Sequence, residues 1–145
     1  MKLSNKISYA LIVLALVGLV DATYLTVKHY TGEPLECSLV AGCEAVLNSG
    51  YSMVLGVPVA LGGVLYYASI FLLVYYIMLT QSEKLFKLLG VVVVGGMLAT
   101  IYFVSLQVFV IKSICQYCMI SAVVTTILVI IMVRVWLKST NEIKK

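Results

Sequence analysis

Four cysteines in two pairs are the residues whose type and spacing could support chemistry in this chain of 145 residues. Cys37 and Cys43 are separated by five residues, and Cys115 and Cys118 form a C-x-x-C motif in "ICQYC". Thiol pairs at such spacings exchange disulfides, form inert structural disulfides or bind zinc. The elements that position the two pairs decide between these chemistries.

The composition indicates a membrane protein. Apolar residues make up 63% of the chain and charged residues 11%, and the mean hydropathy is +1.12. A soluble domain has about 45–50% apolar and about 25% charged residues, so a soluble enzyme and a disordered chain are both excluded. The net charge of +4 does not indicate a nucleic-acid partner, because the ten Lys and Arg residues lie between apolar segments. Membrane lipid is the expected surrounding.

Four apolar stretches are long enough to cross a bilayer, which takes about 20 residues. They cover residues 7–27, 57–79, 85–111 and 114–137. The sequence therefore predicts one all-α membrane domain over residues 1–145, a bundle of four transmembrane helices. Gly18 with Ala22, and Gly95 with Ala99, have the small-xxx-small spacing that predicts close helix contacts.

The distribution of basic residues predicts the orientation of the bundle. Lys28 and Lys112 would lie on one side. Eight basic residues would lie on the other: Lys2, Lys6, Lys84, Lys87, Arg134, Lys138, Lys144 and Lys145. Because basic residues favour the cytoplasmic side, we expect both termini in the cytoplasm and loop 28–56 outside. Within this loop, "GCEAVLNSGYS" predicts a short helix that ends at 48–50.

All four cysteines then map to the outer side, where an oxidising compartment permits disulfides. Ser113 and Gln116 in "SICQ" have the spacing of a helix capping box, which would put Cys115 in the first turn of the last helix. Free backbone N–H groups, the helix dipole and Lys112 would all lower the pKa of this thiol. Cys118 would lie one turn deeper, facing the apolar interior.

Two dithiols on one face of the membrane, one on a loop and one at a helix start, indicate a redox relay. The acceptor would be dissolved in the bilayer, and a lipid quinone fits. One alternative is a non-enzymatic membrane subunit whose outer loop is stapled by inert disulfides. A zinc site is disfavoured by the loose loop spacing and the oxidising compartment, so no metal is predicted.

This order of features resembles the vitamin K epoxide reductase family, including its bacterial and archaeal disulfide-oxidising members. The motifs that carry the resemblance are "YLTVKHY", "CSLVAGC" followed by "EAVLNS", "GVPVALGG" and "CQYC", which together span most of the chain. The resemblance implies a four-helix bundle around a quinone of the menaquinone, ubiquinone or vitamin K type. It also implies the cell membrane of a prokaryote as the location.

The resemblance further implies a role for each cysteine. Cys43 would form a mixed disulfide with a thioredoxin-like partner, Cys37 would exchange with Cys115, and Cys118 would deliver electrons to the quinone. Ser49 matches a loop serine of the family and would lie near the quinone pocket. The implied activity is oxidation of the partner and reduction of quinone, which supports disulfide formation outside the cytoplasm.

Two departures from the family pattern refine this expectation. No thioredoxin-like domain follows the fourth span, so the partner is expected to act in trans. Ala122 stands four residues after Cys118, where animal members that act on vitamin K have a tyrosine. This favours a plain quinone as the substrate and leaves vitamin K epoxide as the alternative.

Several polar residues within the spans are further candidates for the quinone pocket. Asp21 is an acid inside the first span, where a carboxylate is a functional candidate. It would either deliver protons to the quinone or hydrogen-bond to neighbouring side chains. Tyr24, Tyr102 and Gln107 could donate hydrogen bonds to a quinone carbonyl, with a structural role as the alternative for each.

Overall fold

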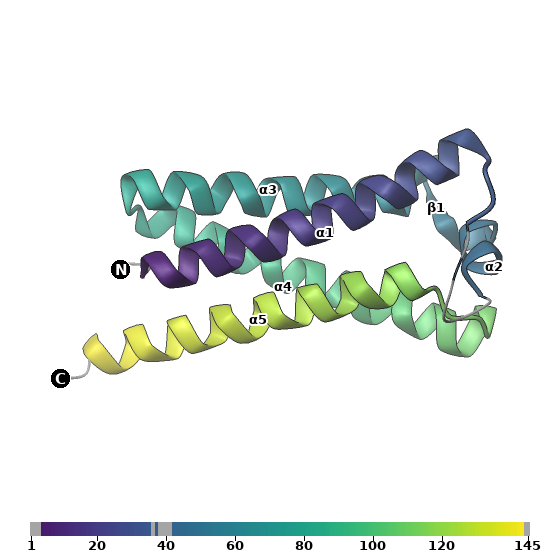
Figure 1. Ribbon diagram of the computed structural model, residues 1–145. Helices are drawn as coiled ribbons and strands as arrows, with labels where there is room; N and C mark the ends of the chain where they lie inside the picture. Colours follow the sequence, from purple (N-terminus) through teal and green to yellow (C-terminus); the bar gives the residue numbers. More distant parts are fainter. Residues whose placement is uncertain (1–3, 36, 38–41, 144–145) are drawn as a thin grey trace.

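The computed structural model describes residues 4–35, 37 and 42–143 and is dominated by long helices. These are α1 (Asn5–Thr31), α3 (Val59–Thr80), α4 (Glu83–Ser105) and α5 (Gln116–Ile143) (Figure 1). A π-helical segment, η2 (Leu106–Ile111), continues α4 without a break. The predicted all-α bundle of four helices is confirmed.

The connection between α1 and α3 contains the smaller elements. It holds α2 (Cys43–Leu47), the 3₁₀ turn η1 (Gly50–Ser52), and an antiparallel hairpin of β1 (Met53–Val54) and β2 (Val57–Pro58). The hairpin turn is Leu55-Gly56, and both residues have positive φ, as a tight two-residue turn requires. The short helix predicted in this loop is confirmed as α2, which ends at Asn48.

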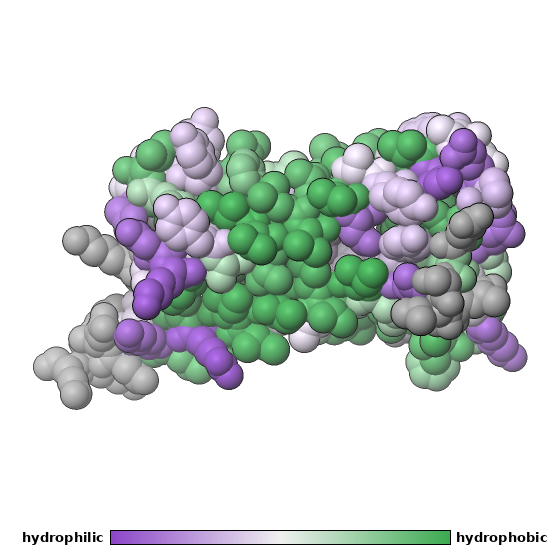
Figure 2. Space-filling view, in the orientation of Figure 1, coloured by the Kyte–Doolittle hydropathy of each residue, from purple (hydrophilic) through white to green (hydrophobic). Residues whose placement is uncertain are grey.

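The surface of the bundle matches a lipid environment. Figure 2 shows apolar side chains gathered around the middle of the molecule and polar side chains at both ends. Each of the four long helices is long and apolar enough to cross a membrane. The shortest, α3, has 22 residues, which at about 1.5 Å per residue exceeds the hydrocarbon core of about 30 Å. Exposed Val20, Leu65 and Val91 are thus suited to contact with lipid.

The two ends of the bundle differ in their content. Both termini lie at one end, and the loop that carries α2 and β1 lies at the other (Figure 1). The basic residues at the start of α1, at the start of α4 and in the second half of α5 belong to the end with the termini. Lys2, Lys144 and Lys145 lie outside the described residues. Which end faces the cytoplasm stays a prediction.

The contact between α1 and α3 depends on small residues. A Cβ atom on Gly18 would collide with the ring of Tyr67, and one on Gly63 would lie 3.2 Å from the Cβ of Ala22. The close contact predicted at Gly18 and Ala22 is therefore confirmed. The contact predicted at Gly95 is wrong, because a Cβ there would meet nothing within 4 Å. Gly95 lines a cavity instead.

Hydrogen bonds hold Tyr67 in place between α3 and α5. Its hydroxyl lies 2.7 Å from Ser121 Oγ and 3.1 Å from Thr125 Oγ1, and it donates to the Ser121 carbonyl at 3.0 Å. In an apolar bundle such bonds satisfy buried polar groups that have no water to bind. They also prevent the ring from moving away from Gly18.

We therefore expect Gly18→Ala to lower the free energy of unfolding by about 1–3 kcal/mol, the usual range for overpacking. Gly90→Ala on α4 is the matched control, since its added Cβ would lie 4.0 Å from the nearest atom, Met132 Cε. The control should be neutral or slightly stabilising, because alanine favours a helix over glycine. Thermal unfolding in detergent measures both variants, and equal stability of Gly18→Ala and the wild type would contradict the packing argument.

Candidate active site

The loop cysteines form a disulfide that lies against the segment before α5. Cys37 is bonded to Cys43, the first residue of α2, and Cys43 is buried. Gly42 lies so close to Ile114 that a Cβ would stand 2.6 Å from its carbonyl oxygen and 2.8 Å from its backbone nitrogen. Because both of these atoms belong to the backbone, no side chain can move aside. Glycine at position 42 therefore allows the loop to reach the neighbour of Cys115.

One buried cluster joins the two cysteine pairs. Cys43 and Cys115 are members of its core, and Cys37 and Cys118 pack against it. The other core members are Leu25, Leu35 and Val46. The structure thus brings together four thiol positions that are up to 81 residues apart in the chain.

Cys115 and Cys118 are free thiols at the start of α5. The Cys115 carbonyl accepts the first helical hydrogen bond, from the N–H of Met119 at 3.1 Å, so Cys115 caps the helix. The capping box predicted for Ser113 and Gln116 is therefore wrong. Ser113 lies before the cap, and its N–H donates to the Gln107 carbonyl at 3.1 Å.

Hydrogen bonds to its sulfur lower the pKa of Cys115 to about 7. The largest cause is a hydrogen bond from the Cys118 thiol, and the backbone N–H groups of Cys118 and Tyr117 add to it, whereas burial opposes the shift. The direction is the one expected from the sequence, but the main donor is Cys118 and not the helix terminus. Cys115 is thus the thiol of the motif that ionises near neutral pH.

Gln107 ties the C-x-x-C motif to the end of α4. Its side chain is buried, and its Oε1 accepts the backbone N–H of Cys115 at 3.0 Å. The π-helical turn η2 carries Gln107, and such turns often occur at functional sites. Gln107 thereby holds the first cysteine of the motif.

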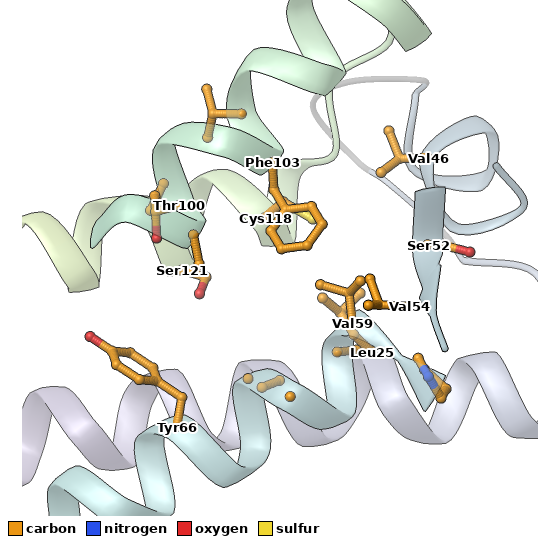
Figure 3. Close-up of a pocket in the computed structure, with 18 of the residues that line it drawn as sticks. Leu25, Val46, Ser52, Val54, Val59, Tyr66, Thr100, Phe103, Cys118 and Ser121 are labelled. Atoms are coloured by element: carbon orange, nitrogen blue, oxygen red, sulfur yellow. The ribbon is translucent and has the colours of Figure 1, made fainter. Parts of the chain in front are cut away.

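A cavity of about 620 Å³ opens beside Cys118. Its volume falls within the range of about 300–1,000 Å³ that is common for small-molecule sites. In Figure 3, Cys118 and Phe103 lie on one side of this space and Tyr66 on the other, and the Ser121 hydroxyl is directed toward it. Apolar residues make up most of the lining, among them Leu25, Val46, Val54, Val59 and Val104.

A known family matches most of the chain. The model of the vitamin K epoxide reductase family covers residues 9–133. The chain belongs to this family. A comparison with curated proteins found no match. Family membership makes the chain an integral membrane oxidoreductase of disulfide and quinone chemistry.

Several residues predicted for the quinone pocket of this family member line the cavity. Cys118, Ser49, Asp21 and Gln107 are among its lining residues. The Ser49 hydroxyl donates to the Val46 carbonyl at 2.7 Å, which fixes the loop at the cavity wall. The lining also includes Ala122, the position that departs from the animal members.

The two tyrosines predicted for the pocket, Tyr24 and Tyr102, lie outside the cavity lining. The Tyr24 ring packs on Tyr117, with 5.1 Å between ring centroids, and the Tyr102 side chain is exposed beside Phe103. Neither tyrosine is among the residues that line the cavity, which gives no support to the predicted contact with a quinone. Sequence reasoning missed Tyr66 and Ser121. Both lie on helices that are apolar on every side, so no pattern marked the face that points inward.

We expect the thiolate fraction of Cys115 to rise with pH through about 7, because its hydrogen bonds stabilise the charged form. The variant Cys118→Ala removes the strongest of these bonds. The midpoint of the Cys115 titration should then move up toward that of an ordinary cysteine. The ultraviolet absorbance of the thiolate, corrected with Cys115→Ala, follows the titration without requiring access to the buried sulfur. A wild-type midpoint that already equals that of an ordinary cysteine would contradict the assignment.

Proposed function

We propose that this protein oxidises a thioredoxin-like partner and passes the electrons through its two cysteine pairs to a lipid quinone. The activity would support disulfide formation outside the cytoplasm. The observation that carries the proposal is the position of the C-x-x-C motif. Cys115 packs with the Cys37–Cys43 disulfide, and Cys118 lines an apolar cavity.

The first half of the reaction is disulfide exchange at the loop pair. A thiolate of the partner attacks Cys43, and the mixed disulfide is resolved by the second thiol of the partner, which leaves Cys37 and Cys43 reduced. The Cys37 thiolate then attacks Cys115 of an oxidised C-x-x-C pair, and Cys118 leaves as the thiolate. When Cys43 displaces Cys115 from Cys37, the loop disulfide is restored and the motif is reduced.

The pairing in the structure corresponds to the end of this first half. The loop pair is oxidised, and Cys115 and Cys118 are free thiols. In this state two electrons are held beside the cavity. Their transfer to a quinone restores the Cys115–Cys118 disulfide, and the net reaction is partner dithiol plus quinone giving partner disulfide plus quinol.

The cavity lining favours a quinone over vitamin K epoxide. Ala122 presents a methyl group where animal members that act on vitamin K have a tyrosine hydroxyl. The two free thiols next to a cavity also support a relay over a membrane subunit with inert disulfides. The excess of basic residues at the end with the termini supports an outward position for the cysteines in a prokaryotic cell membrane.

Cys118→Ser should abolish quinone reduction, because it removes the sulfur that faces the cavity and leaves the loop disulfide in place. The assay follows quinol formation in detergent with a thioredoxin-like donor. The expected rate equals that of a reaction without protein. Near-normal turnover by Cys118→Ser would contradict the role given to this cysteine.

Cys43→Ala should block the protein donor more than a small dithiol. The partner needs Cys43 for the mixed disulfide, whereas dithiothreitol can reduce the Cys115–Cys118 pair directly. The comparison uses quinol formation by the same preparation with each donor in turn. Equal loss with both donors would contradict a shuttle through the loop pair.

A further inference from the structure

Asp21 lies on the face of α1 that is turned toward the cavity. Gly18, Asp21, Ala22 and Leu25 are buried and follow the spacing of one helical stripe. The neighbours of Asp21 on this stripe form the closest approach to α3, where Gly18 meets the Tyr67 ring and Ala22 meets Gly63. The helix is therefore fixed in rotation, and Asp21 lines the cavity together with Cys118.

The Asp21 carboxyl has no partner within the described part of the chain. Its exposure is 9%, and its Oδ2 makes no hydrogen bond. The ion pairs among the described residues join Lys28 to Glu33 and Lys87 to Glu83, so neither includes Asp21. A carboxylate buried in an apolar bundle without a counter-charge is unfavourable, and the protonated acid is the form that fits this place. Among the described residues its O–H then has no hydrogen-bond acceptor, while the cavity lies beside it.

A second polar group in the same cavity shares this property. The Tyr66 hydroxyl is also buried without a hydrogen-bond partner, and Tyr66 is one of the residues that line the cavity. In contrast, the neighbouring Tyr67 hydroxyl is bonded to Ser121 and Thr125. Two residues of one apolar cavity, Asp21 and Tyr66, therefore carry a buried polar atom that the described part of the chain leaves without a partner.

We propose that Asp21 is a catalytic residue that protonates one oxygen of the quinone, an inference that rests on the function proposed above. Reduction of a quinone to a quinol takes two electrons and two protons. The electrons come from Cys115 and Cys118 as their S–H bonds break and the disulfide forms. Asp21 transfers its carboxyl proton to one quinone oxygen and regains a proton from one of the two thiols, and the proton of the other thiol goes to the second quinone oxygen.

Several other titratable groups face Asp21 or share its cavity: Tyr66 and Tyr67 on α3, the two cysteines of the motif, Tyr117 on α5 and His29 on α1. The tyrosines are much weaker acids than a carboxyl group. The thiols are the source of the electrons. His29 lies two helical turns from Asp21 on α1, and Asp21 is the carboxyl group among the residues that line the cavity.

Asp21→Asn tests the proposal, because it keeps the size of the side chain and removes the acidic proton. The variant, preloaded with electrons by dithiothreitol and freed of excess reductant, is mixed with a short-chain quinone in detergent. We expect quinol formation to slow by about 100-fold, the low end of what general acid catalysis contributes. Exchange between the two cysteine pairs should stay at the wild-type level, because it does not use this proton. Quinone binding should be retained, because the amide N–H of Asn can still donate a hydrogen bond to the quinone oxygen. A wild-type rate of quinol formation would overturn the proposal.

Ser8→Ala is the matched control, since Ser8 Oγ is the third buried group without a partner and does not line the cavity. It should form quinol at the wild-type rate. Asp21→Glu retains an acid on the same face and should recover part of the rate. If the wild type itself forms no quinol, the proposed function fails. If the wild type is active and Asp21→Asn equals it, only the role of Asp21 fails.

A measurement on the wild type decides the question if Asp21→Asn does not fold. The infrared spectrum of the dithiol state should contain the carbonyl band of a protonated carboxyl. This band should shift when a quinone binds, because the acid then donates a hydrogen bond to the quinone oxygen. Absence of the band, or a band that quinone leaves unchanged, would overturn the proposal.

Discussion

The close approach of Gly42 to the backbone of Ile114 is the constraint on which the site depends. The atoms in contact are backbone atoms, so the distance between the loop and the segment before α5 is set without any adjustable side chain. This contact seats α2, and with it Cys43, in the same buried cluster as Cys115. The loop disulfide and the reactive thiol therefore meet although they are far apart in the chain.

Electrons must also pass from the loop to the interior of the bundle. The first turn of α5 provides this path, because it carries both cysteines of the motif. Cys115 caps the helix, where its thiolate is stabilised, and Cys118 follows three residues later at the cavity wall. At about 1.5 Å rise per residue the two positions differ by only a few ångströms in depth. Exchange between these two thiols thus needs little movement of the helix, and the Gln107 side chain fixes the backbone at Cys115.

The sequence predicts those parts of the fold that depend on composition, and less of those that depend on tertiary contacts. The four spans follow from hydropathy, which each residue carries by itself, and their observed ends differ by a few residues. The cap of α5 was misplaced because the side chain of Gln107, on another helix, takes the N–H of Cys115. The role of a small residue cannot be predicted from its spacing for a similar reason. Gly18 allows a close helix contact, whereas Gly95 lines a cavity.

In the candidate site, too, some residues can be predicted from the sequence and others depend on tertiary contacts. The cysteines are marked by their type and spacing, whereas Tyr66 and Ser121 become visible only when the fold gives their helices an inner face. Most buried hydroxyls of the bundle, such as those of Tyr67 and Thr125, have hydrogen-bond partners. Leaving a buried polar group unpaired costs about 1–3 kcal/mol, and this chain leaves two of them, Asp21 and Tyr66, at one cavity. The free protein thus gives up stability in residues that line this cavity.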